Sequence, residues 1–254
     1  MIKVKDILEY LNTLAPFDNK CEWDNCGLLI GDIKAETNKI GFTLDLTPSV
    51  LENAKKNGVD LIVTHHPVIF RAQKNFLKGD IAFETAKAGI SVISCHTCYD
   101  CAKAGVSDVL AETIGLTNIC EVETEEKPSC VRIGDSKSCT PLQLAQNVSD
   151  KLSTTVRLAK GNRDIKKVAV CGGSGGDFIF DALKAGADAY VTGDLSHHHF
   201  LLAEQMGMTI IGAGHFETEN PAVFPLMNKV CAKFSEIIGI YLGEENPVEF
   251  IGKN

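Results

Sequence analysis

Apolar and polar residues follow two patterns along the chain, and together these predict an α/β fold. Residues 4–14 place Ile7, Leu8, Leu11 and Leu14 at helical spacing, so we expect an amphipathic helix there. Other apolar residues gather in short, β-branched runs, which are typical of buried parallel strands. The strands predicted in this way are residues 40–44, 60–64, 90–94, 167–171 and 209–211.

One pattern occurs twice. Residues 40–58 read as strand, turn, helix and glycine, and residues 168–186 repeat this order with the same spacing. Gly58–Thr64 then matches Gly186–Thr192 position by position. Both halves therefore read strand–helix–strand–helix–strand, which predicts a duplicated α/β architecture with mainly parallel sheets.

A polar stretch separates the two halves. Residues 120–138 contain several glutamates close together, so we expect the domain boundary there. Residues 1–125 would form the first α/β half and residues 126–254 the second, with the C-terminal segment packing back on the first.

Adjacent histidines end the second predicted strand. His65 and His66 follow residues 60–64 directly, and Pro67 bars a simple continuation of the strand. Open α/β sheets bind ligands at the carboxyl ends of their strands. Because neighbouring side chains point to opposite sides, the pair could serve two metal ions, or one metal and one substrate. The alternative is ordinary loop polarity beside a proline.

Three further groups of possible metal ligands follow predicted strands. They contain His96 and Asp100, then Asp194 with His197–His199, then His215 and Glu219. If a helix begins at His215, then His215 and Glu219 share one face and can hold one metal. The alternative is a capped helix start with an exposed acid.

These groups suggest different roles for their members. Asp100 is the carboxylate that we add to His65 and His66, and either Asp100 or Glu219 could bridge two ions. His96 fits a ligand, a partner that orients a ligand, or an acid–base group, and the orienting role is favoured.

Three consecutive histidines cannot all face one point. We therefore expect Asp194 and His198 near the site, and His197 and His199 on the surface or in packing.

The cysteines and one glycine-rich segment are weaker evidence for a metal or ligand site. Cys95, Cys98 and Cys101 are spaced as in iron–sulfur proteins, but a cluster needs a fourth thiolate, so we expect buried or incidental thiols. The glycine-rich segment 171–177 could cradle an anion on its amides or simply form a tight strand-to-helix turn.

Composition narrows the class of protein. The formal net charge is −8 and the pI about 5.4, which argues against nucleic-acid binding. No apolar run approaches the length of a membrane span, and the N-terminus does not resemble a signal peptide. Ten cysteines without a secretory signal lead us to expect a cytoplasmic protein.

Taken together, six motifs resemble the GTP cyclohydrolase I type 2 homologue family, also called the Nif-three-like family. They are WDNCGLLIG (23–31), THHP (64–67), HTCYD (96–100), CGGSGG (171–176), TGDLSHH (192–198) and GHFETE (214–219). They occur in the family's order. One difference is Cys98-Tyr99, where the family usually has Asn-Leu; it leaves the expected ligands intact but changes the polarity beside them.

The resemblance implies an intertwined two-domain fold, a toroidal homohexamer, and a dinuclear metal site between the domains and inside the ring. It implies that two divalent ions are bound per chain. Zn, Fe, Mn, Co and Ni all suit mixed imidazole and carboxylate donors. The ligands it implies are His65, His66, Asp100, His215 and Glu219.

The leading hypothesis is a metal-dependent hydrolase of a nucleotide or related small phosphorylated compound. His96 or His198 would carry protons, with Asp194 beside them as a third candidate catalytic residue. The alternative is a ring-shaped metal-binding, interaction or metal-handling protein without turnover.

Overall fold

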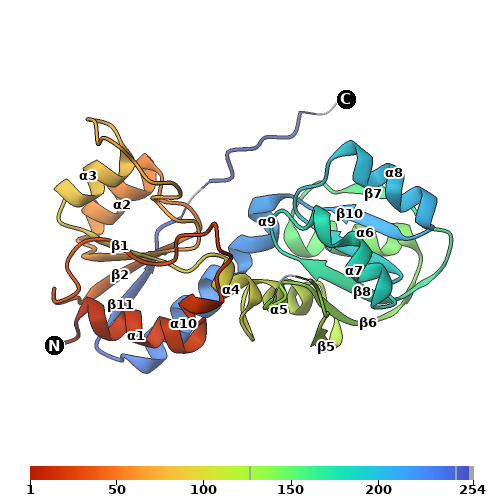
Figure 1. Ribbon diagram of the computed structural model, residues 1–254, viewed down its shortest axis with the longest axis horizontal. Coiled ribbons are helices and arrows are strands. Elements are labelled where there is room, and N and C mark those ends of the chain that lie inside the picture. The colour runs from red at the N-terminus through yellow and green to blue at the C-terminus, as the bar shows by residue number, and fades with distance from the viewer. Residues whose placement is uncertain (126, 244, 252–254) are drawn as a thin grey trace. The chain divides into compact units, whose positions relative to one another are not determined.

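The computed structural model describes residues 1–125, 127–243 and 245–251 (Figure 1). The chain divides into two compact units. The first contains Met1–Lys103 and Val223–Asn246, and the second contains Ala104–Ala222 with the residues from Pro247 onward. Each unit has its own sheet.

The sheet of the first unit has the strand order β1-β4-β3-β2-β11. Strands β2 (Lys39–Thr43), β3 (Leu61–Thr64), β4 (Ser91–Ser94) and β11 (Ile238–Tyr241) pair in parallel, and β1 (Gly27–Ile30) pairs antiparallel with β4. β11 comes from the C-terminal part of the chain and lies beside β2. The three central strands are buried along their apolar length, as their continuous β-branched runs predict.

Helices cover both faces of this sheet, with α2 and α3 on one side and α1 and α10 on the other (Figure 1). Their bounds are Val4–Leu14 (α1), Pro48–Asn57 (α2), Ile81–Lys87 (α3) and Val223–Lys233 (α10), and a short helix, Thr97–Cys101 (α4), follows β4. The predicted helix at residues 4–14 is confirmed as α1. Thr47 caps α2 by accepting a hydrogen bond from the Val50 amide, and Gly58 ends that helix in the left-handed conformation.

The sheet of the second unit has the order β5-β6-β8-β9-β10-β7. Its central strands β8 (Ile165–Cys171), β9 (Ala189–Thr192) and β10 (Thr209–Gly212) are parallel. Antiparallel strands flank them: β5 (Thr117–Glu121) and β6 (Arg132–Cys139) on one side and β7 (Arg157–Ala159) on the other. Glu121 ends β5, and Glu123 and Glu125 lie in the connection that follows it.

Two apolar clusters sandwich this sheet. Val168 and Val170 of β8 pack on the side of α5 (Val106–Thr113) and α6 (Pro141–Leu152). The alternate residue Ala169 packs on the side of α7 (Ile179–Lys184) and α8 (His197–Met206). Burial of both faces explains why the sequence shows continuous apolar runs here instead of an alternating pattern.

The duplication predicted from sequence is confirmed. The first unit contains β2-α2-β3-α3-β4, the second contains β8-α7-β9-α8-β10, and in both the three strands are neighbours in parallel register. Because the chain leaves the first unit, builds the second and then returns, the two α/β units are intertwined in sequence. The predicted α/β fold class is therefore correct.

Candidate metal centre

In the first unit, imidazole rings gather at the carboxyl ends of β3 and β4. His65 and His66 follow β3, and His96 follows β4, its parallel neighbour. The ring centroids of the three histidines are 5.0–5.3 Å apart. One nitrogen from each ring lies within 4.8 Å of the others. This is the strand-end cluster that the sequence predicts.

Hydrogen bonds on Nδ1 orient the first two rings. His65 Nδ1 is 2.9 Å from the carbonyl oxygen of Cys95, and His66 Nδ1 is 2.8 Å from Oδ1 of Asp45. A carbonyl or carboxylate oxygen can only accept, so each ring donates its hydrogen from Nδ1. In the neutral imidazole the lone pair is then on Nε2. This arrangement is typical of metal-binding histidines.

Asp100 faces the lone pair of His65. The Nε2 of His65 and Oδ1 of Asp100 are 3.4 Å apart, and both residues are largely screened from solvent. Two acceptor atoms repel at this distance unless a proton or metal ion accompanies them. Two donors of a tetrahedral ion, with bonds of about 2.0–2.1 Å, lie about 3.3–3.4 Å apart. The donor chemistry and the separation therefore fit a divalent cation.

His96 is held by a buried carboxylate. Its Nδ1 lies 2.8 Å from Oδ1 of Asp24, whose side chain is fully enclosed. Asp24 also accepts hydrogen bonds from the amide and hydroxyl of Thr97 and from the amide of Asn25. Burial alone would raise the pKa of Asp24, but the hydrogen bonds from His96 and Thr97 outweigh it and hold that pKa far below its usual range.

In the second unit, His215 and Glu219 begin and end a short helix. This helix, α9 (His215–Glu219), starts at His215, as the predicted i,i+4 spacing requires. Nε2 of His215 is 3.1 Å from Oε2 of the buried Glu219, and Nδ1 of His215 is 2.7 Å from Oδ2 of Asp194. Asp194 thus orients His215 in the same way as Asp45 orients His66.

The glycine-rich segment after β8 packs against this pair. Gly173 has a positive φ of 61°, and a Cβ there would collide with Oε1 of Glu219. The amides of Gly173 and Gly175 donate to the hydroxyls of Thr218 and Thr192. Because these amides are used internally, the geometry favours a tight turn that makes room for Glu219 over an anion cradle.

The charge on His215 depends on pH. Burial would lower the pKa of His215, but its contacts with Glu219 and Asp194 outweigh burial and raise that pKa to about 9. In the metal-free protein the ring is thus protonated at neutral pH. Since the raised pKa belongs to the folded state, its contribution to stability is complete below the ordinary value of 6.5 and is lost as the pH rises through about 9.

We therefore expect metal binding at His215 to release about one proton at pH 7 and almost none above pH 10. Calorimetric titration with a divalent cation in buffers of different ionisation enthalpy measures this release. Asp194→Asn removes one of the two negative partners, so the proton release of this variant should decline at a lower pH. Equal proton release at pH 7 and pH 10 would contradict the assignment.

A model of the family described as Duf34/NIF3 (NGG1p interacting factor 3) matches residues 2–246. The chain belongs to this family. A relative from Clostridium perfringens named "GTP cyclohydrolase 1 type 2 homolog" is 33% identical over 262 residues, which cover 98% of this chain and 100% of the relative. The resemblance stated from the motifs is confirmed.

Solved structures of the Duf34/NIF3 family share the fold. A Bacillus cereus protein related to NIF3 superimposes with a TM-score of 0.90 at 21% identity, covering 98% of this chain and 99% of that one. Reduced HcgD from Methanocaldococcus jannaschii has a TM-score of 0.82 at 30% identity, covering 95% and 98%. The two-unit architecture is thus that of the Duf34/NIF3 proteins.

The histidine run of this Duf34/NIF3 chain starts α8. His197 and His198 are exposed, and the rings of His198 and His199 lie 4.1 Å apart. Nδ1 of His199 accepts a hydrogen bond from the Ser196 amide, so this residue caps the helix. The catalytic role of His198 stays a prediction.

The cysteines that follow β4 are packed inside the first unit. Cys95, Cys98 and Cys101 are all buried. Cys95 and Cys98 are free thiols, but Cys101 is disulfide-bonded, so the thiol expected at that position is wrong. A hydrogen bond with Cys26, 3.5 Å away, and burial raise the pKa of the Cys98 thiol far above its ordinary value. In the part of the chain that the structure describes, no group of three metal donors includes a cysteine.

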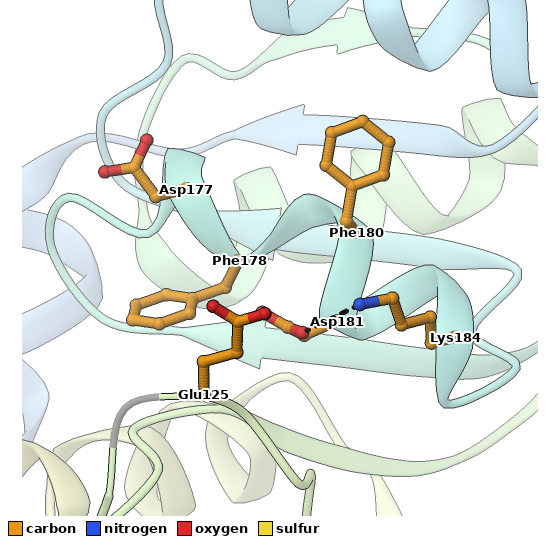
Figure 2. A pocket seen from close by; sticks show the side chains of 6 residues that line it. All are labelled: Glu125, Asp177, Phe178, Phe180, Asp181 and Lys184. Carbon is orange, nitrogen blue, oxygen red and sulfur yellow. Dashed lines mark ion pairs between the residues drawn. The ribbon is translucent and has the colours of Figure 1, made fainter.

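A cavity of about 440 Å³ lies in the second unit (Figure 2). Its lining combines two aromatic rings with charged groups, and the lining residues are Glu125, Asp177, Phe178, Phe180, Asp181 and Lys184. Lys184 pairs with Asp181 at 3.8 Å, as the dashed line shows. None of the predicted site residues lines this cavity.

Two orienting carboxylates were not predicted from sequence. Asp24 lies in the loop before β1 and Asp45 in the loop after β2, and neither belongs to a metal-donor spacing. The role of each becomes visible only from its hydrogen bond to a histidine that is distant in the sequence.

Among the described helices we find none long and apolar enough to cross a bilayer.

Proposed function

We propose that this protein is a dinuclear metal-dependent hydrolase that acts on a nucleotide or related small phosphorylated compound. His65, His66, Asp100, His215 and Glu219 would hold two divalent ions per chain, of Zn, Fe, Mn, Co or Ni. The observation that carries the proposal is the shared orientation of the histidines. His65, His66 and His215 each engage an acceptor through Nδ1, which directs Nε2 toward a ligand.

When bound, the ions would supply Lewis acidity that activates a water molecule and stabilises developing negative charge. The chain's own contribution is proton transfer and orientation. His96 donates from Nδ1 to Asp24, so its Nε2 can accept a proton from the attacking water. Asp24 then stabilises the imidazolium, as the carboxylate does in other His–Asp pairs. Asp194 orients His215, and His198 is the second candidate proton carrier.

The substrate class is supported by the names of the relatives. Proteins called "GTP cyclohydrolase 1 type 2 homolog" match at 30–34% identity. We therefore propose a purine nucleotide, attacked by water at the imidazole carbon of its base. By the same family resemblance we propose a homohexamer in the cytoplasm, whose stoichiometry sedimentation velocity can measure.

A non-catalytic role in metal handling is the second candidate. It is favoured by the glycine-rich turn, where the amides of Gly173 and Gly175 already donate to threonine hydroxyls and are therefore occupied. This alternative predicts bound metal without turnover of any nucleotide.

Metal content per chain tests the proposal. Untagged protein prepared without chelator should contain about two divalent ions, as a two-metal site requires. The double variant His65→Ala/Glu219→Ala should lose them, because it removes one donor from each unit. A matched control, His197→Ala/Glu204→Ala, changes an exposed histidine and an exposed acid of α8 and should keep them.

Turnover decides between the two functions. Hydrolysis of GTP or another nucleotide by the wild type and the control, but not by the double variant, supports the hydrolase. Metal that is lost in the double variant, with no turnover by the wild type, supports metal handling. Protein that contains no metal, or metal that survives the double substitution, contradicts the ligand assignment.

A further inference from the structure

Two large aromatic side chains of the first unit are exposed beside the histidine cluster. Trp23, the single tryptophan of the chain, is 58% exposed and Phe70 is 45% exposed. Their ring centroids are 5.7 Å apart with the planes inclined at 49°. Exposed aromatic rings that sit together are typical of binding surfaces. We call Trp23 and Phe70 the aromatic shelf.

The aromatic shelf is continuous with the proposed catalytic residues. His96 lies edge-on to Trp23 at 5.9 Å and edge-on to Phe70 at 6.3 Å. The same imidazole is 5.2 Å from His65 and 5.3 Å from His66. A flat ring resting on the shelf would therefore border both the proposed proton carrier and the metal donors of this unit.

A hydrogen bond links the two segments that form the shelf. Nδ2 of Asn25 donates to the carbonyl oxygen of Ile69 at 2.7 Å, so the chain beside Trp23 is tied to the chain beside Phe70. Asp24, adjacent to Trp23, is in turn fixed by Thr97. The shelf is thus built on a braced loop, and a ligand need not order it on binding.

Positive charge accompanies the shelf in a chain whose net charge is −8. Phe70 begins an exposed segment, residues 70–79, that carries Arg71, Lys74 and Lys78 and no acidic residue. Such side chains attract phosphate oxygens. An aromatic shelf with a basic segment beside it complements a flat base joined to phosphate.

We propose that Trp23 and Phe70 stack the base of the substrate, while the basic segment 70–79 meets its phosphates. This inference rests on the proposed nucleotide hydrolase and assigns the residues that select its base. Stacking on aromatic side chains accepts any base face, so the shelf supplies affinity for a flat heteroaromatic ring without fixing its identity. An exposed protein-docking surface is the competing interpretation.

The single tryptophan allows a direct test, because all indole emission comes from Trp23. The metal-loaded protein is titrated with guanosine monophosphate, and separately with ribose 5-phosphate, which has no base. We expect saturable quenching by the nucleotide only. Phe70→Ala should weaken nucleotide binding about tenfold to a hundredfold and leave ribose 5-phosphate binding unchanged, as measured by calorimetry.

One control variant and one phosphate-site variant separate recognition of the base from recognition of the phosphate. Phe76→Ala removes another exposed aromatic ring of the same segment and should leave both affinities unchanged. Arg71→Ala/Lys74→Ala should weaken both ligands to a similar extent, because it acts on the phosphate. Thermal unfolding checks that each variant is folded.

The outcomes distinguish the shelf from the proposed function. Quenching that is weakened by Phe70→Ala supports the shelf even if no nucleotide is hydrolysed. Hydrolysis with no quenching, and with full affinity in Phe70→Ala, overturns the shelf and leaves the hydrolase intact. A metal-loaded protein that neither binds nor is quenched by any nucleoside monophosphate also overturns the shelf.

Discussion

Replacing Asp24 by alanine is expected to lower the free energy of unfolding by about 2–4 kcal/mol, because it removes a buried charged acceptor. The side chain accepts hydrogen bonds from His96, from Asn25 and twice from Thr97. After the substitution these donors remain enclosed with fewer acceptors. Urea unfolding measures the loss, and nucleotide turnover should fall with it because His96 loses the partner that orients its ring.

Two further variants separate the charge of Asp24 from its mere presence. Asp18→Ala removes an exposed acid from the same N-terminal region and should change the free energy of unfolding by less than about 0.5 kcal/mol. Asp24→Asn keeps the shape but lacks one acceptor, so we expect a loss between those of the other two. If Asp24→Ala lowered the free energy of unfolding no more than Asp18→Ala does, the hydrogen bonds to Asp24 would contribute nothing to stability.

The difference in unfolding free energy between the wild type and Asp24→Asn should depend on pH, in a direction set by the pKa of Asp24. Burial opposes ionisation of Asp24, yet the hydrogen bonds from His96 and Thr97 set its folded-state pKa below the ordinary value of 3.8. The stabilisation is therefore complete well above pH 3.8 and declines as the pH falls below it toward the folded-state pKa. Wild type and Asp24→Asn should thus differ by a constant amount at neutral pH and converge in acid.

Asp24 also shows where sequence reasoning about the site ends. His65 and His66 can be predicted because an apolar strand stops at them, and His215 with Glu219 because their spacing places both on one helical face. Asp24 and His96 are 72 positions apart, and no periodicity links them. Their contact follows only from β1 pairing with β4, which brings the loop before one strand to the end of the other.

The fold, like the site, could be predicted from the sequence only where a regular pattern of residues marks an element. Strands buried on both faces, such as β3 and β9, leave continuous apolar runs that repeat in the two halves. β6 (Arg132–Cys139) is different, because Lys137 and Ser138 in its second half are exposed and its register shifts after Asp135. Its residues therefore look like part of a polar junction, and the antiparallel edge that it builds has no clear signal in the sequence.

Replacing Gly193 by alanine is expected to disturb the second unit's donor pair, although both donor side chains are kept. A Cβ at Gly193 would lie 2.6 Å from the carbonyl oxygen of Gly173, 2.8 Å from Cα of His215 and 2.9 Å from the carbonyl oxygen of Gly214. All three neighbours are backbone atoms, so rotation of a side chain cannot relieve the overlap. Overpacking of this kind typically costs about 1–3 kcal/mol, and at this site the backbone that must move carries His215.

The displacement should appear as weaker metal binding. Gly193 precedes Asp194, and both amides donate to the carbonyl oxygen of Gly173. Any shift therefore separates Asp194 from His215, which lowers the pKa of His215 and loosens its ring. Gly212→Ala is the matched control, because its Cβ would first meet Leu195 Cδ1 at 3.3 Å, a side-chain methyl that can adjust. Metal content and urea unfolding unchanged in Gly193→Ala would mean that this turn is more compliant than its three backbone contacts imply.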